Sequence, residues 1–557
     1  MFRSTLASRR RRKPSKPSLA WKRQLQFEPL EERRVLAPIA DVGLSLQPQA
    51  MLGSDVNFTV TFDNTAANVA SNTGFGPYVD VIFPKTGADG DDGLSFTSVS
   101  AGSLAVTPQR VTFDATGHAV HPFAKTATGA PLVIAHPDGA AGAGDELVVV
   151  ALPFGSFTPA QTPTSLSFKA KLSDLADLDQ PLTVIATGGY QFGADALDNP
   201  TTDAPIRGTT QTASITPTVF SFGKSYNGIS DDDGATIELS TGPNHPASFT
   251  LAVDLATGQQ VSGLEISDIL PQNHSFLAVT SVLINGVSAT PGVDYVVASS
   301  PTVMTAPPYR ASSPNRTLDL AFHNSLGVPT LITGSGAGTV LVTVSFYIPE
   351  FQGNGTTVVI SPTTGNKVVE ANVATVLGTV DPKDPRDSLV PTSATSGPTT
   401  IQEESLTLQK SSSVVYDAAP AGMSPGDIVE WTLHFDVSDF FAFNNLRISD
   451  IVDDGVEFDP TNADPNLGVS PKLTVTRGGV TSGPLSFSLA GSGAPFTGSD
   501  NYFYSVDTDG LLGDFPNLAS DPLHTGQTQF DFDVSKLLRD SSLDGKFVGG
   551  LFANRNA

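Results

Sequence analysis

Cysteine is absent from the 557 residues, tryptophan occurs twice and methionine four times, and only 16% of the residues are charged. Without cysteine, disulfide bonds and thiolate metal sites are excluded. No apolar run approaches the roughly 20 residues that a membrane-spanning helix requires, so no transmembrane segment is predicted. The motifs H-E-x-x-H and G-x-S-x-G and the phosphate-binding P-loop are also missing. We therefore expect a protein that is not an enzyme.

Negative charge dominates most of the chain, but positive charge dominates its start. The formal net charge is −25. Residues 1–36 hold 11 of the 31 Lys and Arg but only 3 of the 56 Asp and Glu, which leaves 20 basic against 53 acidic residues, or −33, for the remainder. An acidic body repels phosphate groups and keeps a long chain soluble. We do not expect this body to bind nucleic acid.

Turn and strand residues are abundant, with 51 Gly, 42 Pro and 33 Phe. In the stretch 427–460, the apolar Val429, Trp431 and Leu433 alternate with polar residues. This period of two is typical of a strand with one buried face. Short runs of this kind recur along the chain, whereas apolar stripes of helical spacing are few. The sequence therefore predicts an all-β fold with many turns.

Part of the chain is an internal repeat. Two Ile-Ser-Asp-Ile tetrapeptides begin at Ile266 and Ile448, and Phe249 and Trp431 are separated by the same distance along the sequence. We call this common separation the repeat offset. A looser copy occupies residues 57–84. Two features that share one offset indicate repeated modules.

The repeat suggests a division of the chain. We predict a basic leader at 1–37, module one at 38–205, module two at 219–387 and module three at 406–557. Thr/Pro-rich linkers are expected at 206–218 and 388–404. Module three is expected to be incomplete, without a counterpart of the last strand of module two, and the chain to be a fragment of a longer protein.

The motifs of module three suggest a family. They are Lys410-Ser411, then Pro425-Gly426-Asp427, then the strand Trp431-Thr432-Leu433 and finally the tetrapeptide at 448–451. In this combination they resemble the DUF11-like modules of bacterial surface proteins, which are related to the isopeptide-forming domains of fimbrial subunits. The resemblance implies tandem immunoglobulin-like β-sandwiches.

The related fimbrial domains carry a Lys in their first strand and an Asn in their last strand. By this resemblance, the candidate residues of module two are Lys224, Asn372 and Asp268. A Lys amine made neutral by burial could attack the Asn carboxamide while a protonated carboxyl group polarises it. The alternative, which the sequence favours, is that Lys224 lies at an edge or in solvent. Module one has no Lys in its first strand.

The end of the leader resembles the LEPR-XLL motif of large exported bacterial proteins. Residues 27–37 place Leu30, Glu31, Arg33, Arg34 and Leu36 where the pattern expects them. Glu32 stands in the place of the Pro of the motif. The resemblance implies export. The alternative is a disordered basic tail that touches nucleic acid or anionic lipid.

Two groups of residues are candidates for metal ligands. Acidic loops recur, and the best candidate for calcium is the cluster of Asp89, Asp91 and Asp92, because Ca²⁺ prefers carboxylate and carbonyl oxygens. Asp-Gly is also the default turn dipeptide, so the sequence favours ordinary turns or a solvated face over calcium binding. His118, His121 and His136 are interpreted as histidines of surface loops rather than as a zinc site. No other cofactor is expected.

Taken together, these patterns predict a secreted or cell-surface protein with a structural or adhesive role. Other surface proteins or extracellular polysaccharide would be its partners. The alternative is an accessory region of a larger extracellular enzyme or adhesin, acting as a carbohydrate-binding part or a calcium-stiffened spacer. An exposed aromatic strip would favour sugar binding, and the candidate residues for it are Phe440, Phe441, Phe443 and Tyr502 to Tyr504.

Overall fold

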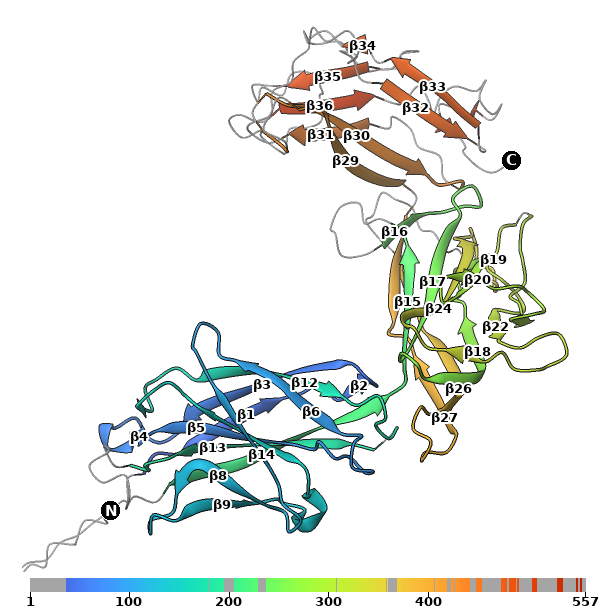
Figure 1. Cartoon of the computed structure of the whole chain (residues 1–557). Helices are drawn as coiled ribbons and strands as arrows, with labels where there is room; N and C mark the ends of the chain where they lie inside the picture. The colour runs from blue at the N-terminus through green and yellow to red at the C-terminus, as the bar shows by residue number, and fades with distance from the viewer. Residues whose placement is uncertain are drawn as a thin grey trace, which may run out of the picture.

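The computed structural model describes residues 37–194, 205–228, 237–356, 358, 368–417 and 422–440, with single positions left out at 179, 307, 405 and 425; beyond residue 440 it describes only the strands. Figure 1 shows β-strands along the whole described chain. The described helical elements are two short 3₁₀ turns, η1 (Ala70–Asn72) and η2 (Gly139–Gly142). The predicted all-β, tandem β-sandwich fold is confirmed.

Module one consists of two sheets with an apolar layer between them. Along β3, the apolar Val56, Phe58, Val60 and Phe62 point inward and alternate with more exposed residues. One sheet has the order β1 (Ala40–Ser45), β3 (Asp55–Asn64), β12 (Thr164–Leu172) and β6 (Leu94–Ser100). The other has the order β2 (Gln49–Met51), β14 (Ile206–Thr218), β13 (Leu182–Tyr190), β5 (Pro77–Phe83), β10 (Glu146–Ala151) and β7 (Pro108–Thr112).

Two smaller pairs complete this module. The hairpin of β8 (His118–Lys125) and β9 (Pro131–Ala135) packs against the outer side of the second sheet through a small apolar cluster that includes Tyr78 and Phe113. The short strands β4 (Gly74–Phe75) and β11 (Ser156–Phe157) also pair with each other. The second sheet is thus covered on both faces, which explains why every residue of β5 is buried.

Module two is also a sandwich of two facing sheets, and it has a small third sheet. One sheet has the order β15 (Phe220–Asn227), β17 (Ala247–Leu255), β24 (Gly336–Tyr347), β19 (Ser275–Ile284) and β20 (Val287–Ser288). The facing sheet has the order β21 (Val296–Ser299), β22 (Thr317–Ala321), β18 (Gln260–Ile269), β26 (Ala374–Asp381) and β27 (Val390–Thr395), with β23 (Ile332–Thr333) also on β18. A small third sheet has the order β16 (Ile237–Ser240), β28 (Thr399–Glu404) and β25 (Val368–Asn372).

Module three is described through its strands. These form the pairs β29 (Leu406–Tyr416) with β30 (Ile428–Val437), β32 (Lys472–Arg477) with β33 (Val480–Ser486), and β37 (Phe547–Val548) with β38 (Leu551–Phe552). A four-stranded sheet has the order β31 (Arg447–Val452), β36 (Thr528–Asp533), β35 (Phe503–Asp507) and β34 (Ser488–Leu489).

The predicted linkers are wrong. Residues 206–218 form β14, which pairs with β13 along most of its length, and residues 388–404 contain β27 and β28. Their Thr-rich composition suits a strand because a β-branched side chain favours extended backbone. Val219 alone separates β14 from β15, and it is buried. The buried apolar residues of modules one and two consequently form one continuous cluster.

Candidate functional site

The lysine that the sequence singled out lies in the core of module two. β15 alternates buried and exposed residues, and Lys224 takes an inward position between the buried Phe222 and Tyr226. Its backbone pairs with that of Leu251 on β17. β15 is the edge strand of its sheet, but the side chain of Lys224 is fully buried. The alternative of a solvent-exposed Lys224 is therefore wrong.

The other two candidates come from the two other sheets of module two. Asp268 points inward from β18, and its backbone pairs with that of Ala374 on β26. Asn372 is the last residue of β25, two residues before β26 begins. Thr399 holds this region to β15, because it pairs with Asn372 and its hydroxyl donates to the backbone oxygen of Lys224 at 2.6 Å.

The three side chains meet at the carboxylate. The Nζ atom of Lys224 lies 2.6 Å from Oδ2 of Asp268, and Nδ2 of Asn372 donates to Oδ1 of Asp268 at 3.0 Å. The side chains of Lys224 and Asp268 have 0% exposure, and Asn372 has 3%. The Asp268 carboxylate therefore bridges the amine nitrogen and the amide nitrogen in a dry environment. In this geometry it faces the nitrogen of the carboxamide rather than its carbonyl oxygen.

Aromatic rings enclose the amine. Nζ of Lys224 lies 3.8 Å from the ring centre of Phe249 and 5.8 Å from that of Tyr226. Burial lowers the pKa of Lys224, and the charge and hydrogen bond of Asp268 oppose that shift. A proton that moves from Nζ to the carboxylate would leave a neutral amine beside a neutral acid. A neutral pair avoids the cost of two buried charges.

A histidine that sequence reasoning missed contacts Tyr226, one of the aromatic residues around Lys224. His274 is completely buried, its Nε2 atom is 2.9 Å from the hydroxyl of Tyr226, and its ring stacks on Phe346 with centres 4.3 Å apart. Burial, followed by the charge of Lys224, holds the pKa of His274 well below its usual range. Its ring is therefore neutral. No motif surrounds it, so the sequence offered no signal for its role.

Module one has apolar residues at the corresponding strand positions. Leu44 pairs with Val60 where Lys224 pairs with Leu251, and the buried Val81 pairs with Ala186 where Asp268 pairs with Ala374. The sandwich can thus be built without the buried charges. Lys224 and Asp268 are consequently not a requirement of the fold.

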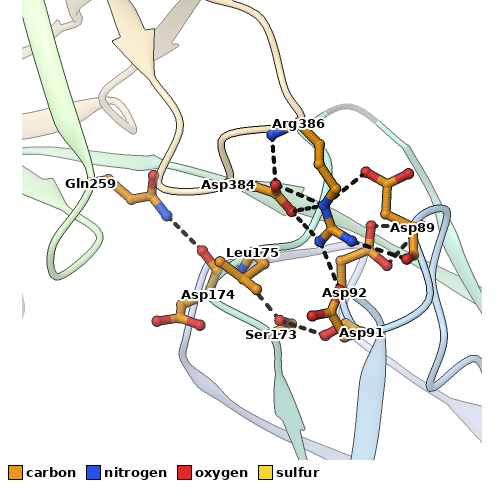
Figure 2. A network of polar contacts seen from close by, with 9 residues as sticks. All are labelled: Asp89, Asp91, Asp92, Ser173, Asp174, Leu175, Gln259, Asp384 and Arg386. Carbon is orange, nitrogen blue, oxygen red and sulfur yellow. Dashed lines mark hydrogen bonds and ion pairs between the residues drawn. The ribbon is translucent and has the colours of Figure 1, made fainter.

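The predicted calcium cluster lies where module one meets module two (Figure 2). Carboxylate oxygens of Asp89, Asp92 and Asp177 lie within 4.8 Å of one another, so the structure adds Asp177 to the predicted set. Asp91 instead binds Nη2 of Arg386, at 2.7 Å. This arrangement was hidden from the sequence because Asp177 and Arg386 lie far from residues 89–92 along the chain.

Arg386 supplies positive charge to this cluster. Its guanidinium contacts Asp384 and lies 3.4 Å from a carboxylate oxygen of Asp89. Asp177 remains beside other acids. Burial raises its pKa to about 6, and the hydrogen bond and charge of Asp387 add to this shift. The Arg386 guanidinium therefore already provides positive charge beside these carboxylates, and the carboxyl group of Asp177 holds its proton more tightly than usual.

Two further polar contacts join the modules at the same place. The side-chain amide of Gln259 donates to the backbone oxygen of Asp174 at 2.7 Å, and Lys383 forms an ion pair with the Asp174 carboxylate. Figure 2 shows these loops of both modules side by side. Together with the continuous apolar cluster, they make the junction a packed interface rather than a loose tether.

The prediction of surface-loop histidines is wrong for two of the three. His121 lies on β8 and is buried, with Nε2 3.2 Å from Asp80. His136 is buried with Nε2 3.3 Å from Asp145. The partners lie on other strands or loops, so sequence spacing could not reveal them. Among the described residues, the three carboxylates at the junction are the one cluster with metal-ligand spacing, and it contains no histidine.

The remaining candidates fall outside the described residues or into the core. The export motif at 30–36 and Phe441, Phe443 and Tyr502 lie outside the described residues. Phe440 is buried and packs on Tyr309 with ring centres 6.0 Å apart, so it is not part of an exposed aromatic strip. Within the described part of the chain, no helix has the length and apolar character needed to cross a bilayer.

The comparisons with known proteins concern the fold alone. No family model matches the chain, and no curated protein matches it. Among solved structures, the C-terminal domain of the AgI/II polypeptide BspA of Streptococcus agalactiae is 8% identical and has a TM-score of 0.19, over 65% of this chain and 100% of that one. The major pilin SpaD of Corynebacterium diphtheriae is 13% identical with a TM-score of 0.21, over 63% of this chain and 66% of that one. The MSCRAMM ACE of Enterococcus faecalis is 10% identical with a TM-score of 0.18, over 66% and 95%.

Proposed function

We propose that module two forms an intramolecular isopeptide bond between Nζ of Lys224 and Cγ of Asn372, and that the protein is a non-catalytic structural or adhesive component of an extracellular surface. One observation carries the proposal: the amine, the carboxamide and a bridging carboxylate are buried together, at 2.6 Å and 3.0 Å. Reactive groups held this closely in a dry site need little further ordering to react.

The reaction needs no partner from outside. Neutral Nζ attacks Cγ of Asn372, the new C–N bond forms, the bond from Cγ to Nδ2 breaks, and ammonia leaves. One proton must pass from Nζ to Nδ2, and Asp268 contacts both nitrogens, so it can take the proton from one and deliver it to the other. Burial lowers the pKa of Lys224 and so favours the neutral amine that attacks. Each molecule reacts once, so the protein is not an enzyme.

The position of the bond suits a protein under tension. Lys224 lies on the first strand of module two and Asn372 on a strand near its end, so the bond would close a loop that contains most of the module. A covalent bond between these strands bypasses the hydrogen-bonded sheets. The packed junction with module one would transmit tension from one module to the next. A secreted or surface location and partners among other surface proteins or extracellular polysaccharide complete the proposal.

Intact mass of the full chain tests the bond. We expect the mass to be lower than the sequence requires by one ammonia for this bond, and Lys224→Arg to restore that ammonia. Tandem mass spectrometry should identify a branched peptide that joins Lys224 to Asn372. An unbranched Lys224 peptide in the folded protein would overturn the proposal. Protease treatment of intact producing cells tests the location, because a surface protein is cleaved and an internal protein is protected.

A further inference from the structure

Two long segments of module two are almost free of charge. Residues 269–309 contain a single charged residue, Asp294, and residues 320–349 contain no Asp, Glu, Lys or Arg. The carboxylate of Asp294 accepts a hydrogen bond from the backbone N–H of Thr290 at 2.8 Å. The chain as a whole has a formal net charge of −25. These segments therefore differ from the acidic surface that the rest of the protein presents.

Two loops in these segments expose apolar side chains. The loop before β21 carries Val293, and the turn after β22 carries Leu326 and Val328. All three side chains are exposed, and Leu326 reaches 87%. Val297 on β21 is exposed as well. We call these four residues the apolar patch. A group of exposed apolar side chains on a soluble protein commonly marks an interaction site.

Hydrogen bonds hold the two loops side by side. The backbone N–H of Ser325 donates to the backbone oxygen of Gly292 at 2.8 Å. The hydroxyl of Thr330 donates to the backbone oxygen of Asp294 at 2.8 Å. Because these contacts lie on both sides of Val293 and of the tip of the turn, the apolar side chains of the two loops belong to one surface.

The turn that carries Leu326 is itself fixed. The side-chain oxygen of Asn324 accepts hydrogen bonds from the backbone N–H groups of Leu326 at 2.9 Å and Val328 at 3.0 Å. The backbone N–H of Gly327 donates to the backbone oxygen of Asn324 at 2.9 Å. Gly327 has a φ of 78°, which glycine adopts readily. The turn is thus preorganised, so a contact made by Leu326 would cost little ordering entropy.

Charge decides which partner fits the apolar patch. Two copies of this acidic chain repel each other over most of their surface, and a charge-free region is where they can approach. We propose that a second copy of this chain covers the patch. With two-fold symmetry, Leu326 of each copy would pack against Val293 and Val297 of the other copy.

The contact would be made by side chains rather than by strand pairing. β21 is the edge strand of its sheet, but its register shifts between Val297 and Ser299, and such an irregularity interrupts an intermolecular ladder. This pairing would join copies on one surface or on facing surfaces. It does not depend on the bond proposed for Lys224.

Sedimentation velocity of the full chain tests the proposal. The patch is small, so we expect a weak dimer with a Kd of about 0.1 mM or below. Added salt should strengthen the dimer, because salt screens the repulsion between acidic chains and does not weaken apolar contacts. Leu326→Lys and Val293→Lys should abolish it. Each of these changes lowers the net negative charge, so general repulsion cannot explain the loss.

Controls separate the apolar patch from other surfaces. Leu389 is 62% exposed and lies outside the patch, so Leu389→Lys should leave the dimer intact. Lys224→Arg should also dimerise like the wild type, which keeps this inference distinct from the proposed bond. Equal loss of the dimer in Leu389→Lys would show an effect of added charge alone and would contradict the proposal.

The remaining outcomes identify another occupant or another surface. A wild type that stays monomeric at about 0.1 mM in high salt overturns the proposal. If that monomer binds phosphatidylcholine vesicles and Leu326→Lys does not, the patch contacts lipid instead. A dimer that persists in both Leu326→Lys and Val293→Lys would show that the copies meet elsewhere.

Discussion

Replacing the buried polar residues of module two by apolar ones should change stability in a direction that depends on the bond. The variant combines Lys224→Met, Asp268→Leu and Asn372→Ala. Module one shows that a sandwich of this kind accepts such residues, because Leu44 and the buried Val81 occupy corresponding strand positions. All three partners are exchanged together, so no buried charge or amide is left unpaired.

The expected magnitude follows from the length of the closed loop. A cross-link between positions 224 and 372 closes a loop of roughly 150 residues, and it would stabilise the folded state by about 5 kcal/mol if it constrains the unfolded chain as a disulfide does. The variant loses this contribution. If no bond exists, the same variant replaces a buried ion pair, and such replacements are neutral or stabilise by about 1–4 kcal/mol.

Hydrogen exchange of the full chain, followed by mass spectrometry, measures the effect within module two. Peptides from β17 and β24 report its central strands, which open only when the module unfolds. Peptides from β3 and β12 of module one serve as an internal reference. We expect faster exchange in β17 and β24 of the variant and little change in β3 and β12. Equal or slower exchange in β17 and β24 would refute the cross-link.

Three further predictions concern the junction of modules one and two and the residue His274 near Lys224. The pKa of Asp177 is raised to about 6 in the folded protein, against about 4 in the unfolded chain. The proton that the folded state holds more tightly therefore stabilises it fully below about pH 4, and this stabilisation is lost as the pH rises through about 6. Asp177→Asn should flatten this part of a plot of thermal midpoint against pH. Arg386→Gln should lower the thermal midpoint only slightly, since Arg386 and two of its partners, Asp89 and Asp91, are partly exposed. Calcium should raise the midpoint of this variant but not that of the wild type; an equal rise in the wild type would show that calcium binds beside Arg386. His274→Phe should cost about 1 kcal/mol in urea unfolding, because the hydroxyl of Tyr226 loses its hydrogen bond to His274; an unchanged midpoint would contradict this.

The sequence predicted the strands whose two faces differ most. β3 and β17 alternate strictly along most of their length, so their period of two identified both the strand and its buried face. The repeat offset identified module two and module three as copies. The fold class followed from these two signals. The chemistry of the candidate bond stays a prediction, although the structure brings its three residues together.

What the sequence did not predict depends on partners that are distant along the chain. Residues 206–218 appeared to be a linker because Thr and Pro mark their composition, yet β13 provides hydrogen-bonding partners along most of β14. The Gly/Ala-rich stretch around His121 favoured a loop, and its contact with Asp80 on β5 left no local signal. Arg386 and Asp91 are 295 residues apart. Local patterns contain no information about such pairings.

The difference between modules one and two argues for chemistry over packing as the reason for the buried triad. Buried ion pairs seldom stabilise a fold relative to apolar residues of similar volume. Module one fills the corresponding positions with apolar side chains, and its core is continuous with that of module two. Lys224, Asp268 and Asn372 would therefore be a costly way to fill space. A covalent bond removes one of the buried charges and links two strands, so it accounts for all three residues at once.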